Sequence, residues 1–317
     1  MLSFSTLTDI PADFGASVVT VGNFDGVHRG HAALLHEVVQ RATARGIRSC
    51  AVTFEPHPLQ VLHPDRAPEL IASTTSRYER LAATGLDAVL VLEFTAELAA
   101  MTPEEFVRDV FVDGLHAAEV VVGRDTRFGV KNSGDVDTLR QLGQQFGFAV
   151  DVLPDVGEDH RISSTDVRRA LADGAVDVAA RALGHVHDVR GVVVRGLQRG
   201  RELGFPTANL GPKPEGLVPA DGVYVGWLVR EDTARDDAEH RMPAAISVGT
   251  NPTFDDVPER TVEAYVLDRD DLDLYDETVR IEFVRRLRGN TKFDSIDALI
   301  TQMRRDVAQA REICRTR

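Results

Sequence analysis

The chain has 317 residues, enough for two ordinary domains, and its 43% hydrophobic and 27% charged residues are typical of a soluble globular protein. Its formal net charge of −14 argues against a broad nucleic-acid-binding surface, which needs a basic excess. No apolar run approaches the length of a membrane span, MLSFSTLTDIPADFG (1–15) has no basic leader region, and the two cysteines suggest neither disulfides nor zinc. We therefore expect a cytoplasmic protein without nucleic-acid or membrane partners, and leave its oligomeric state open.

Five apolar runs in the first half have the composition of buried parallel strands, with helical periodicity between them. They span residues 17–22, 47–54, 87–94, 118–123 and 148–154. The segment TPEE (102–105) is a capping box with proline at the first helical position, so a helix should begin there. Helices over 163–174 and 176–184 close this half. The alternation predicts a doubly wound parallel sheet in residues 1–184, with ligands at the carboxyl ends of its strands.

After about Gly184 the pattern changes to short β-rich runs separated by turn residues, which is typical of an antiparallel barrel. The runs are RGVVVRG, GVYVGWLVR, PAAISVG, TVEAYVLD and TVRIEFVRRL. An acidic stretch at 230–241 indicates an exposed hairpin loop without chemistry, and a final helix runs from Ser295 to about Arg315. Residues 185–317 are thus predicted to form an antiparallel β-barrel with a C-terminal helix.

Two histidines, His28 and His31, stand where a helix begins after the first predicted strand. A helix N-terminus favours an anion, and the glycines at 22 and 30 allow a ligand to approach the backbone closely. The pair therefore suits a nucleoside triphosphate whose α-phosphorus is attacked while pyrophosphate leaves. Two surface or capping histidines would give the same spacing, and a zinc site would need further ligands.

Three more segments follow later strands at the same edge of the predicted sheet: TFEPHP (53–58), GRDTRFG (123–129) and RISSTDVRR (161–169). In the last, the serines and threonine can cap a helix, while Arg161 and Arg168 supply positive charge. A plain helix cap explains this segment equally well. The chain has neither a G-x-x-x-x-G-K-[ST] loop nor G-x-G-x-x-G, so phosphates must be bound by arginine, histidine, backbone amides or a metal.

The second half carries a glycine-rich element, RGLQRGRELGFPTANL (195–210), that could wrap phosphate. Thr207 and Asn209 offer the hard oxygen ligands that Mg²⁺ prefers, although an ordinary loop has the same composition. In TVEAYVLD (261–268), alternation places Glu263 on the face opposite Val262. Glu263 could accept a proton from a substrate hydroxyl, or it could be an exposed strand residue.

These motifs carry a family resemblance. GNFDGVHRGH, TFEPHP and RISSTDVR resemble the adenylyltransferase module of bacterial bifunctional riboflavin kinase/FAD synthetases, within the HxGH nucleotidyltransferases. GRELGFPTANL, ADGVYVGW, SVGTNPTF, VEAYVLD and residues 274–303 are similar, in this order, to the riboflavin kinase module, although GHVHDVRGVVVRG lacks the usual Arg-Pro-Tyr and His-Gly. The resemblance implies an FMN adenylyltransferase domain over residues 1–184 and a riboflavin kinase domain over 185–317.

The resemblance also implies site residues in the first module. Its catalytic residues would be His28 and His31. The ATP-binding residues would be Gly22, Asn23, Asp25, Gly30, Asp125, Arg161, Ser163, Ser164, Thr165 and Arg168. The flavin-binding residues would be Pro56, His57, Pro58 and Phe128. Thr126 stands where relatives usually carry an aromatic residue.

In the second module the resemblance implies Glu263 as the catalytic base, Thr207 and Asn209 as Mg²⁺ ligands, and ATP binding by Gly200, Arg201, Gly204, Thr207 and Asn209. The implied reactions convert riboflavin and ATP to FMN, then FMN and a second ATP to FAD and pyrophosphate. Two alternatives stay open: an adenylyltransferase for another phosphorylated acceptor whose barrel only binds flavin, and a flavin-sensing regulator. Glu263 and the histidine pair argue against the regulator, because sensing needs neither a base nor a phosphate cradle.

Overall fold

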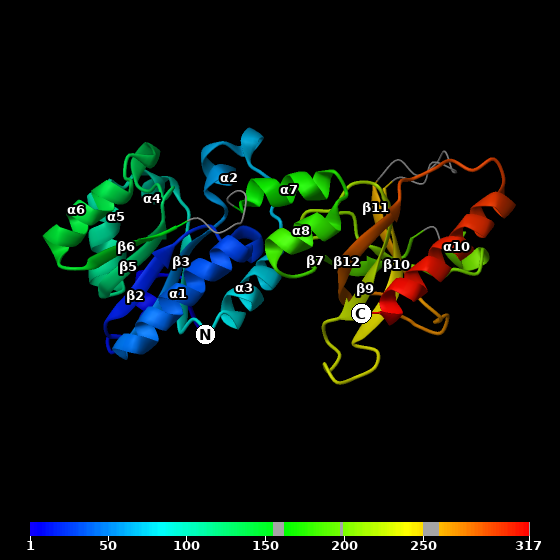
Figure 1. Ribbon diagram of the computed structural model, residues 1–317, viewed down its shortest axis with the longest axis horizontal. Helices are drawn as coiled ribbons and strands as arrows, with labels where there is room; N and C mark the ends of the chain where they lie inside the picture. Colours follow the sequence, from blue (N-terminus) through cyan, green and yellow to red (C-terminus); the bar gives the residue numbers. More distant parts are fainter. Residues whose placement is uncertain (155–161, 197–198, 250–259, 317) are drawn as a thin grey trace. The chain divides into compact units, whose positions relative to one another are not determined.

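The computed structural model describes residues 1–154, 162–196, 199–249 and 260–316. The chain divides into two compact units, here called the first and second units (Figure 1). The first unit comprises Met1–Glu69 and Thr75–Ser163, and the second comprises Leu70–Thr74 and Ser164–Arg317. The predicted boundary between the two activities at residue 184 stays a prediction.

The first unit is built on a six-stranded parallel sheet with the strand order β1-β4-β3-β2-β5-β6. The strands are β1 (Leu2–Phe4), β2 (Ser17–Val21), β3 (Arg48–Glu55), β4 (Ala88–Glu93), β5 (Ala117–Gly123) and β6 (Ala149–Leu153). All five predicted strands are confirmed. Sequence reasoning missed β1, because three residues at a sheet edge give no periodic signal. The order of connection reverses between β2 and β5, which places the switch point of the sheet there.

Apolar side chains cover both faces of this sheet. Val18 in β2 packs in one cluster with Leu35 and Val38 of α1, whereas Val19 belongs to a second cluster with Phe106 and Phe111. Successive strand residues point to opposite faces, so a strand buried on both sides reads as a continuous apolar run. These continuous apolar runs are the pattern from which the buried strands were predicted.

Helices connect the strands of the first unit, as the alternation predicted. They are α1 (Arg29–Arg45), α2 (Pro58–Leu62), α3 (Thr74–Ala83), α4 (Ala96–Ala100), α5 (Pro103–Phe106) and α6 (Val136–Phe146), with a π-helical turn η4 (Val107–Gly114) and short 3₁₀ turns η1 (Leu7–Asp9), η2 (Asp25–Val27), η3 (Pro64–Arg66) and η5 (Val130–Asn132). Thr102 forms the predicted capping box with Glu105 at the start of α5. Gly46 ends α1 with a left-handed φ of 64°, which glycine adopts without steric cost.

The second unit contains a closed six-stranded barrel with the order β10-β11-β8-β7-β12-β9, in which each neighbouring pair is antiparallel. Its strands are β7 (His187–Val194), β8 (Ala208–Leu210), β9 (Gly222–Arg230), β10 (Arg241–Gly249), β11 (Thr261–Val266) and β12 (Thr278–Arg288). The predicted barrel is confirmed, as is the hairpin between β9 and β10. The short strand β8 was missed, because Gly204 and Pro206 made its surroundings resemble a loop.

In the described part of the second unit, four helices accompany the barrel: α7 (Ser164–Ala172), α8 (Val176–Leu183), α9 (Arg199–Glu202) and α10 (Ile296–Arg315). Leu171 of α7 and Leu183 of α8 are buried in the same cluster as Tyr224 and Phe283 of the barrel. Asp306 of α10 is buried, and its carboxylate accepts hydrogen bonds from the guanidinium of Arg288 at 2.7 to 3.1 Å. The expected C-terminal helix is therefore anchored to β12.

A short segment from an early part of the chain belongs to the second unit. In Leu70–Thr74, the side chain of Ile71 is 1% exposed and packs within the barrel cluster. The carbonyl oxygen of Ile71 accepts a hydrogen bond from the backbone N–H of Leu217 at 3.3 Å. The core of the second unit is therefore assembled from two separate parts of the sequence.

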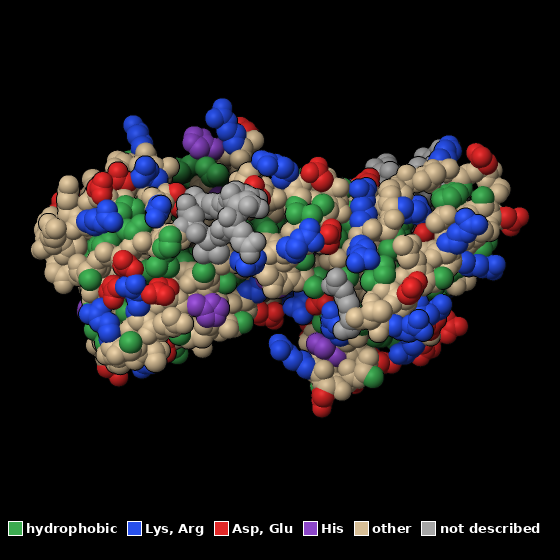
Figure 2. All heavy atoms as spheres, in the orientation of Figure 1, with side chains coloured by type: hydrophobic (Ala, Val, Ile, Leu, Met, Phe, Trp, Pro, Cys, Tyr) green, Lys and Arg blue, Asp and Glu red, His purple; other side chains and the backbone are tan. Residues whose placement is uncertain are grey.

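Basic and acidic side chains are interspersed over the visible face of both units (Figure 2). This mixture matches a chain that has 36 Lys and Arg residues against 50 Asp and Glu residues. None of the described helices is both long and apolar enough to cross a membrane. The cytoplasmic location expected from the sequence stays a prediction.

The two cysteines give a test of the packing. Cys50 in β3 is fully buried, and this burial raises the pKa of its thiol to about 12, whereas Cys314 on α10 is half-buried. Because the thiolate is the reactive form, iodoacetamide at pH 8 should label Cys314 well before Cys50 in the folded protein. Peptide mass spectrometry would measure both rates, with urea-unfolded protein as the control. Equal labelling of the two thiols without urea would contradict the packing of β3.

Candidate active sites

The first candidate site begins at the carboxyl end of β2, where His28 caps helix α1. The Nδ1 atom of His28 accepts a hydrogen bond from the backbone N–H of His31 at 3.2 Å. A neutral imidazole that accepts at Nδ1 carries its proton on Nε2. His28 is only 5% exposed, so the cap fixes both the position of its ring and the location of its proton.

His31 lies directly against His28. The two imidazole rings are stacked, with centroids 3.6 Å apart and planes 17° apart, and Phe24 packs edge-on against His31 at 5.3 Å. A side chain at Gly30 would lie 3.1 Å from the His28 ring and 3.5 Å from the carbonyl oxygen of Ile162. Because Gly30 has no side chain, the turn that carries His28 and His31 can lie close to Ile162, in the segment that leads to Ser163.

The ends of β2 and β3 meet beside this turn. The side-chain amide of Asn23 and the Nε2 atom of His57 are 3.2 Å apart and hydrogen-bonded. His57 itself caps α2, because its Nδ1 atom accepts from the N–H of Leu59 at 3.2 Å, and Pro58 is the first residue of that helix. The structure thus joins His57, predicted to contact flavin, to Asn23, predicted to shape the ATP site.

Sequence reasoning missed a buried arginine that holds this region. Glu55, the last residue of β3, accepts hydrogen bonds from Arg77 Nη2 at 3.0 Å and from the hydroxyl of Tyr78 at 2.6 Å. Arg77 is 4% exposed, and burial together with the bond to Glu55 raises the pKa of Tyr78 to about 12. These contacts anchor the residue that precedes Pro56 and His57. An arginine on the buried face of α3 gave no signal in the sequence.

Other predicted residues of the first module lie near β2 and β5. Asp25 is buried in η2, and a Cβ atom at Gly22 would lie 3.1 Å from the Phe24 ring. Asp125 follows β5, with Oδ1 3.2 Å from the place of a Cβ atom at Gly123. Their assignment to ATP stays a prediction.

The remaining predicted residues are more scattered. Phe128 is 8% exposed and packs in the core 6.2 Å from Phe106, so only a small part of its ring can reach a flavin. Three predicted ATP-binding residues lie in the first turns of α7, in the second unit, while Ser163 ends the first unit. The three are Ser164, Thr165 and Arg168. Arg161 lies outside the described residues.

The second candidate site is a hydrogen-bonded group of four residues in the barrel. Glu263 in β11 accepts from Thr207 Oγ1 at 3.3 Å and from Thr261 Oγ1 at 3.2 Å. Asn209 in β8 stands opposite Glu263 in the strand pairing, and its amide donates to Thr207 Oγ1 at 3.1 Å. Strand β8, which the sequence did not reveal, is what brings Thr207 and Asn209 to Glu263.

The barrel also changes the acidity of Glu263. Burial raises the pKa of its carboxyl group above the ordinary value of 4.5, against the opposing effect of the hydrogen bonds from Thr261 and Thr207. A carboxylate with a raised pKa holds a proton more strongly than an exposed glutamate. Glu263 is therefore better suited to accept a proton from a hydroxyl group.

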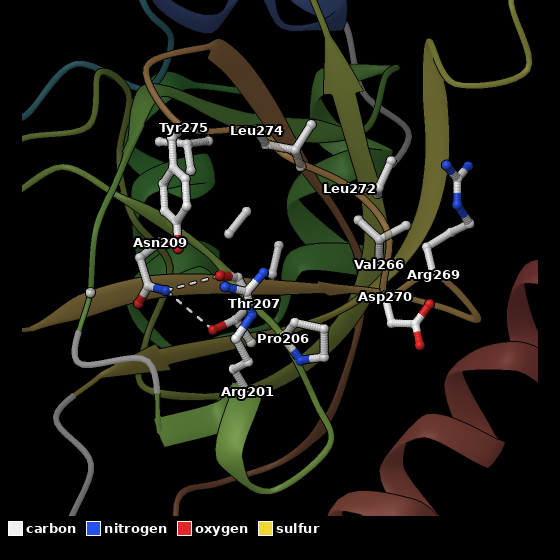
Figure 3. Close-up of a pocket in the computed structure, with 14 residues that line it drawn as sticks. Arg201, Pro206, Thr207, Asn209, Val266, Arg269, Asp270, Leu272, Leu274 and Tyr275 are labelled. Atoms are coloured by element: carbon white, nitrogen blue, oxygen red, sulfur yellow. Dashed lines mark hydrogen bonds between the residues drawn. The ribbon is translucent and has the colours of Figure 1, made fainter.

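Thr207 and Asn209 line a pocket with about 630 Å³ of empty space, including solvent at its mouth (Figure 3). Arg201 joins them at its polar side. Leu272, Leu274 and Tyr275 lie across the pocket from Thr207, and they are joined in its lining by Val193, Val266, Arg269 and Asp270. The pocket thus combines a polar side with an apolar wall, and Glu263 reaches it through Thr207.

Three glycines shape the loop beside this pocket. A Cβ atom at Gly196 would lie 2.8 Å from the side chain of Asn209, and one at Gly200 would lie 2.4 Å from the carbonyl oxygen of Phe205. Gly204 has a left-handed φ of 84°, which favours glycine. The predicted ATP-binding glycines therefore have steric reasons for their identity, while their contact with ATP stays a prediction.

The described residues contain no group of three or more His, Cys, Asp or Glu side chains placed to hold a metal ion. Thr207 and Asn209 offer a different donor set, a hydroxyl and an amide oxygen. Magnesium binds few protein ligands and completes its shell with water and phosphate oxygens, so two such donors at the polar side of a pocket fit it.

Comparison with known proteins covers nearly the whole chain. Residues 10–166 match the FAD synthetase family, and residues 183–314 match the riboflavin kinase family. A bifunctional riboflavin kinase/FMN adenylyltransferase of Pseudomonas fluorescens is 40% identical over 301 residues, and one of Escherichia coli K12 is 36% identical over 296 residues. Both alignments cover 93% of this chain and 92% of the relative.

A solved structure shares the whole fold. A crystal structure from Streptococcus pneumoniae, described as a macrolide-efflux protein, covers 98% of this chain and is itself covered to 98%, with 32% identity and a TM-score of 0.84. The likeness shows that the two chains share the same fold over nearly their whole length. The words "macrolide-efflux protein" describe the streptococcal protein and are not carried over to this chain.

Proposed function

Since the chain belongs to the family of bifunctional riboflavin kinase/FMN adenylyltransferases, we propose that it converts riboflavin to FMN and FMN to FAD with two molecules of ATP. The observation that carries this proposal is the presence of both family matches, in order, over one chain. The purified chain, incubated with riboflavin and Mg-ATP, should yield FMN first and FAD later by chromatography. Bound flavin without either product would contradict the proposal.

In the kinase reaction, Glu263 accepts the proton of the ribityl 5′-hydroxyl as that oxygen attacks the γ-phosphorus of ATP, and ADP leaves. The raised pKa of the buried carboxyl supports this role, as do its hydrogen bonds to two hydroxyl groups. Arg201 lines the same pocket and supplies a positive charge for the phosphates.

Thr207 and Asn209 would hold Mg²⁺ in this pocket, because their oxygens are hard donors and lie at its polar side. The bound ion would neutralise charge on the β- and γ-phosphates during transfer. The hydrogen bond between Asn209 Nδ2 and Thr207 Oγ1 holds the two side chains together.

In the adenylyl transfer, a phosphate oxygen of FMN attacks the α-phosphorus of a second ATP, and pyrophosphate leaves. The attacking phosphate is already ionised, so no general base is required. His28, with its proton on Nε2, and His31 would instead stabilise the charge that grows on the phosphate oxygens. His57, with Pro56 and Pro58 on either side, would contact the flavin.

Replacement of Thr207 tests the metal assignment. Thr207→Ala removes one oxygen donor and should raise the Mg²⁺ concentration needed for half-maximal kinase rate by at least about tenfold. Thr207→Ser keeps the hydroxyl and should stay near the wild type. Adenylylation of supplied FMN should be unchanged in both variants, and an equal loss of the two activities would show damage to the fold instead.

A further inference from the structure

The loop between β11 and β12 forms one wall of the barrel pocket, which is apolar at Leu272, Leu274 and Tyr275. Arg269, Asp270, Leu272, Leu274 and Tyr275 all belong to this loop and all line the pocket. Backbone hydrogen bonds fix its two ends, from Leu267 N to the carbonyl of Pro243 and from Asp276 N to the carbonyl of Val193. The position of the wall between these ends depends on what holds its side chains.

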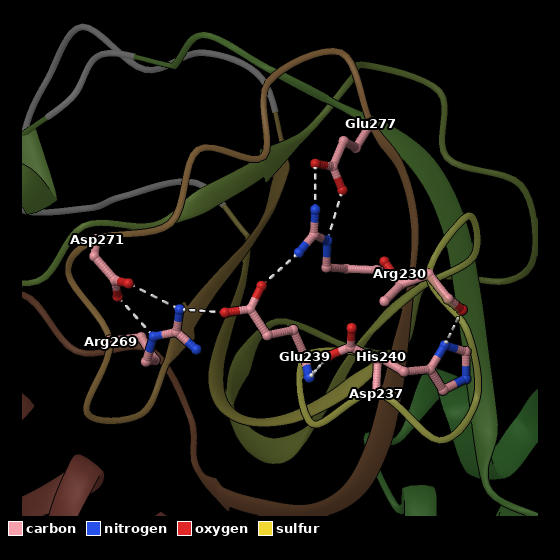
Figure 4. A network of polar contacts seen from close by, with 8 residues as sticks. Arg230, Asp237, Glu239, His240, Arg269, Asp271 and Glu277 are labelled. Carbon is pink, nitrogen blue, oxygen red and sulfur yellow. Dashed lines mark hydrogen bonds and ion pairs between the residues drawn. The ribbon is translucent and has the colours of Figure 1, made fainter.

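Arg269 ties the loop to the hairpin between β9 and β10 (Figure 4). Its Nη2 atom donates to Glu239 Oε1 at 2.6 Å, and its Nε atom donates to Asp271 Oδ1 at 2.6 Å. The other oxygen of Glu239 accepts from Arg230 Nη1 at 2.8 Å. Glu239, from a stretch predicted to carry no chemistry, thus bridges two arginines of the barrel.

The hairpin end of this bridge is itself fixed. Arg230 donates from Nε and Nη2 to the two oxygens of Glu277 at 2.8 and 2.7 Å, a bidentate pair that sets the orientation of the guanidinium. The backbone N–H of Glu239 donates to Asp237 Oδ1 at 2.8 Å, and His240 donates from Nδ1 to the carbonyl of Thr233 at 2.9 Å. Glu239 therefore presents its carboxylate from a structured turn.

The charge of Arg269 is satisfied outside the pocket. The carboxylates of Asp271 and Glu239 raise the pKa of its guanidinium, and together they neutralise its charge. The guanidinium lies in the network with Glu239 and Asp271, while the residue itself forms part of the pocket wall (Figures 3 and 4). Arg269 is thus placed to hold the wall rather than to bind a phosphate.

We propose that the β9–β10 hairpin braces the nucleotide pocket of the kinase, with Glu239 and Arg269 as positioning residues that set the apolar wall of Leu272, Leu274 and Tyr275. This inference rests on the proposed kinase function, and it adds that ATP affinity depends on a carboxylate outside the pocket. If the bridge orders the loop before ATP binds, ATP binding does not lose the free energy of ordering that loop.

The test compares Glu239→Gln with Asp177→Asn, which removes a carboxylate from the exposed Arg181 pair on α8 of the same unit. Glu239→Gln should raise the KM for ATP in riboflavin phosphorylation about two- to fivefold, the loss expected of a partly exposed ion pair, with kcat and the KM for riboflavin unchanged. Asp177→Asn should change none of these constants. Adenylylation of supplied FMN should be the same in both variants.

A double-variant cycle separates bracing from general loosening. Because Glu239 acts through Arg269, Glu239→Gln should add little to the KM of an Arg269→Gln variant. Full additivity, an unchanged KM for ATP, or a rise confined to the KM for riboflavin would each overturn the proposal. The unsubstituted chain tests the kinase assignment by itself: if it forms no FMN, the proposed function fails, whereas an active chain that is indifferent to Glu239 refutes the brace alone.

Discussion

Replacing Glu263 with glutamine should lower the rate of FMN formation about 10²- to 10⁴-fold, the usual cost of losing a general base. Glutamine keeps the size of the side chain and can still hydrogen-bond to Thr207 and Thr261, so riboflavin should still bind. Adenylylation of supplied FMN should continue, because its acceptor needs no deprotonation. Steady-state rates with riboflavin and with FMN measure the two activities separately. Phosphorylation near the wild-type rate would make Glu263 a structural strand residue.

The stability of the same variant gives an independent control. Burial raises the pKa of Glu263 in the folded protein, so the folded state binds this proton more strongly than the unfolded state. Its contribution to the free energy of unfolding is therefore full below the ordinary value of 4.5 and is lost as pH rises through the higher folded pKa. Glutamine does not ionise, so Glu263→Gln should melt no lower than the wild type at pH 7. A lower melting temperature at pH 7 would contradict this expectation.

The pH dependence of the kinase should follow from the same shift. A general base must be deprotonated to act, and the pKa of Glu263, the proposed base, lies above the ordinary glutamate value. The rate of FMN formation should therefore fall in acid with a midpoint above 4.5. The residual rate of the Glu263→Gln variant should not show this fall in acid.

Replacing His28 and His31 with alanine should abolish most FAD formation while FMN accumulates from riboflavin. Each histidine is proposed to donate to phosphate oxygens during adenylyl transfer, and removal of one such donor costs about 10²- to 10³-fold in comparable sites. Chromatography of a riboflavin and Mg-ATP reaction would show the effect directly. Unchanged FAD output would refute the phosphate-binding role of the pair.

His28 also caps helix α1, so its replacement needs a matched control. Alanine loses the cap and should cost about 1 kcal/mol of stability, whereas asparagine restores a good cap for the N–H of His31. If His28→Asn melts like the wild type yet forms FAD slowly, the loss belongs to the reaction and not to the helix. A normal rate in His28→Asn would assign His28 to capping alone.

Local signals predicted most elements, because burial on one face leaves a period in the sequence and burial on both faces leaves a continuous apolar run. The exceptions, β1 and β8, have three residues each, and their pairing partners determine their existence. The helical periods of α7 and α8 indicated a buried face without indicating what covers it, and that partner is the barrel cluster.

The sequence predicted which residues belong to the candidate sites better than it predicted how those residues are arranged in space. His28 and His31 are close in sequence, so the start of helix α1 is enough to bring them together. Thr207 and Glu263 are 56 residues apart, and only barrel closure reveals their hydrogen bond. The wall at Leu272 and Leu274 lies in a loop without periodicity, and its role depends on the distant carboxylate of Glu239.

The discontinuous core of the second unit has a consequence for how the protein is made. Ile71 and its neighbours leave the ribosome long before the barrel strands, yet their buried positions exist only once those strands have closed. During synthesis, residues 70–74 therefore lack the barrel strands that cover them, while the chain on either side of them forms the sheet of the first unit. A fragment cut at the start of α7 would lack Ile71, leaving a gap in its core and the N–H of Leu217 without this acceptor. A fragment that begins at α7 therefore lacks part of the core of the second unit, because residues 70–74 are encoded within the first half of the chain.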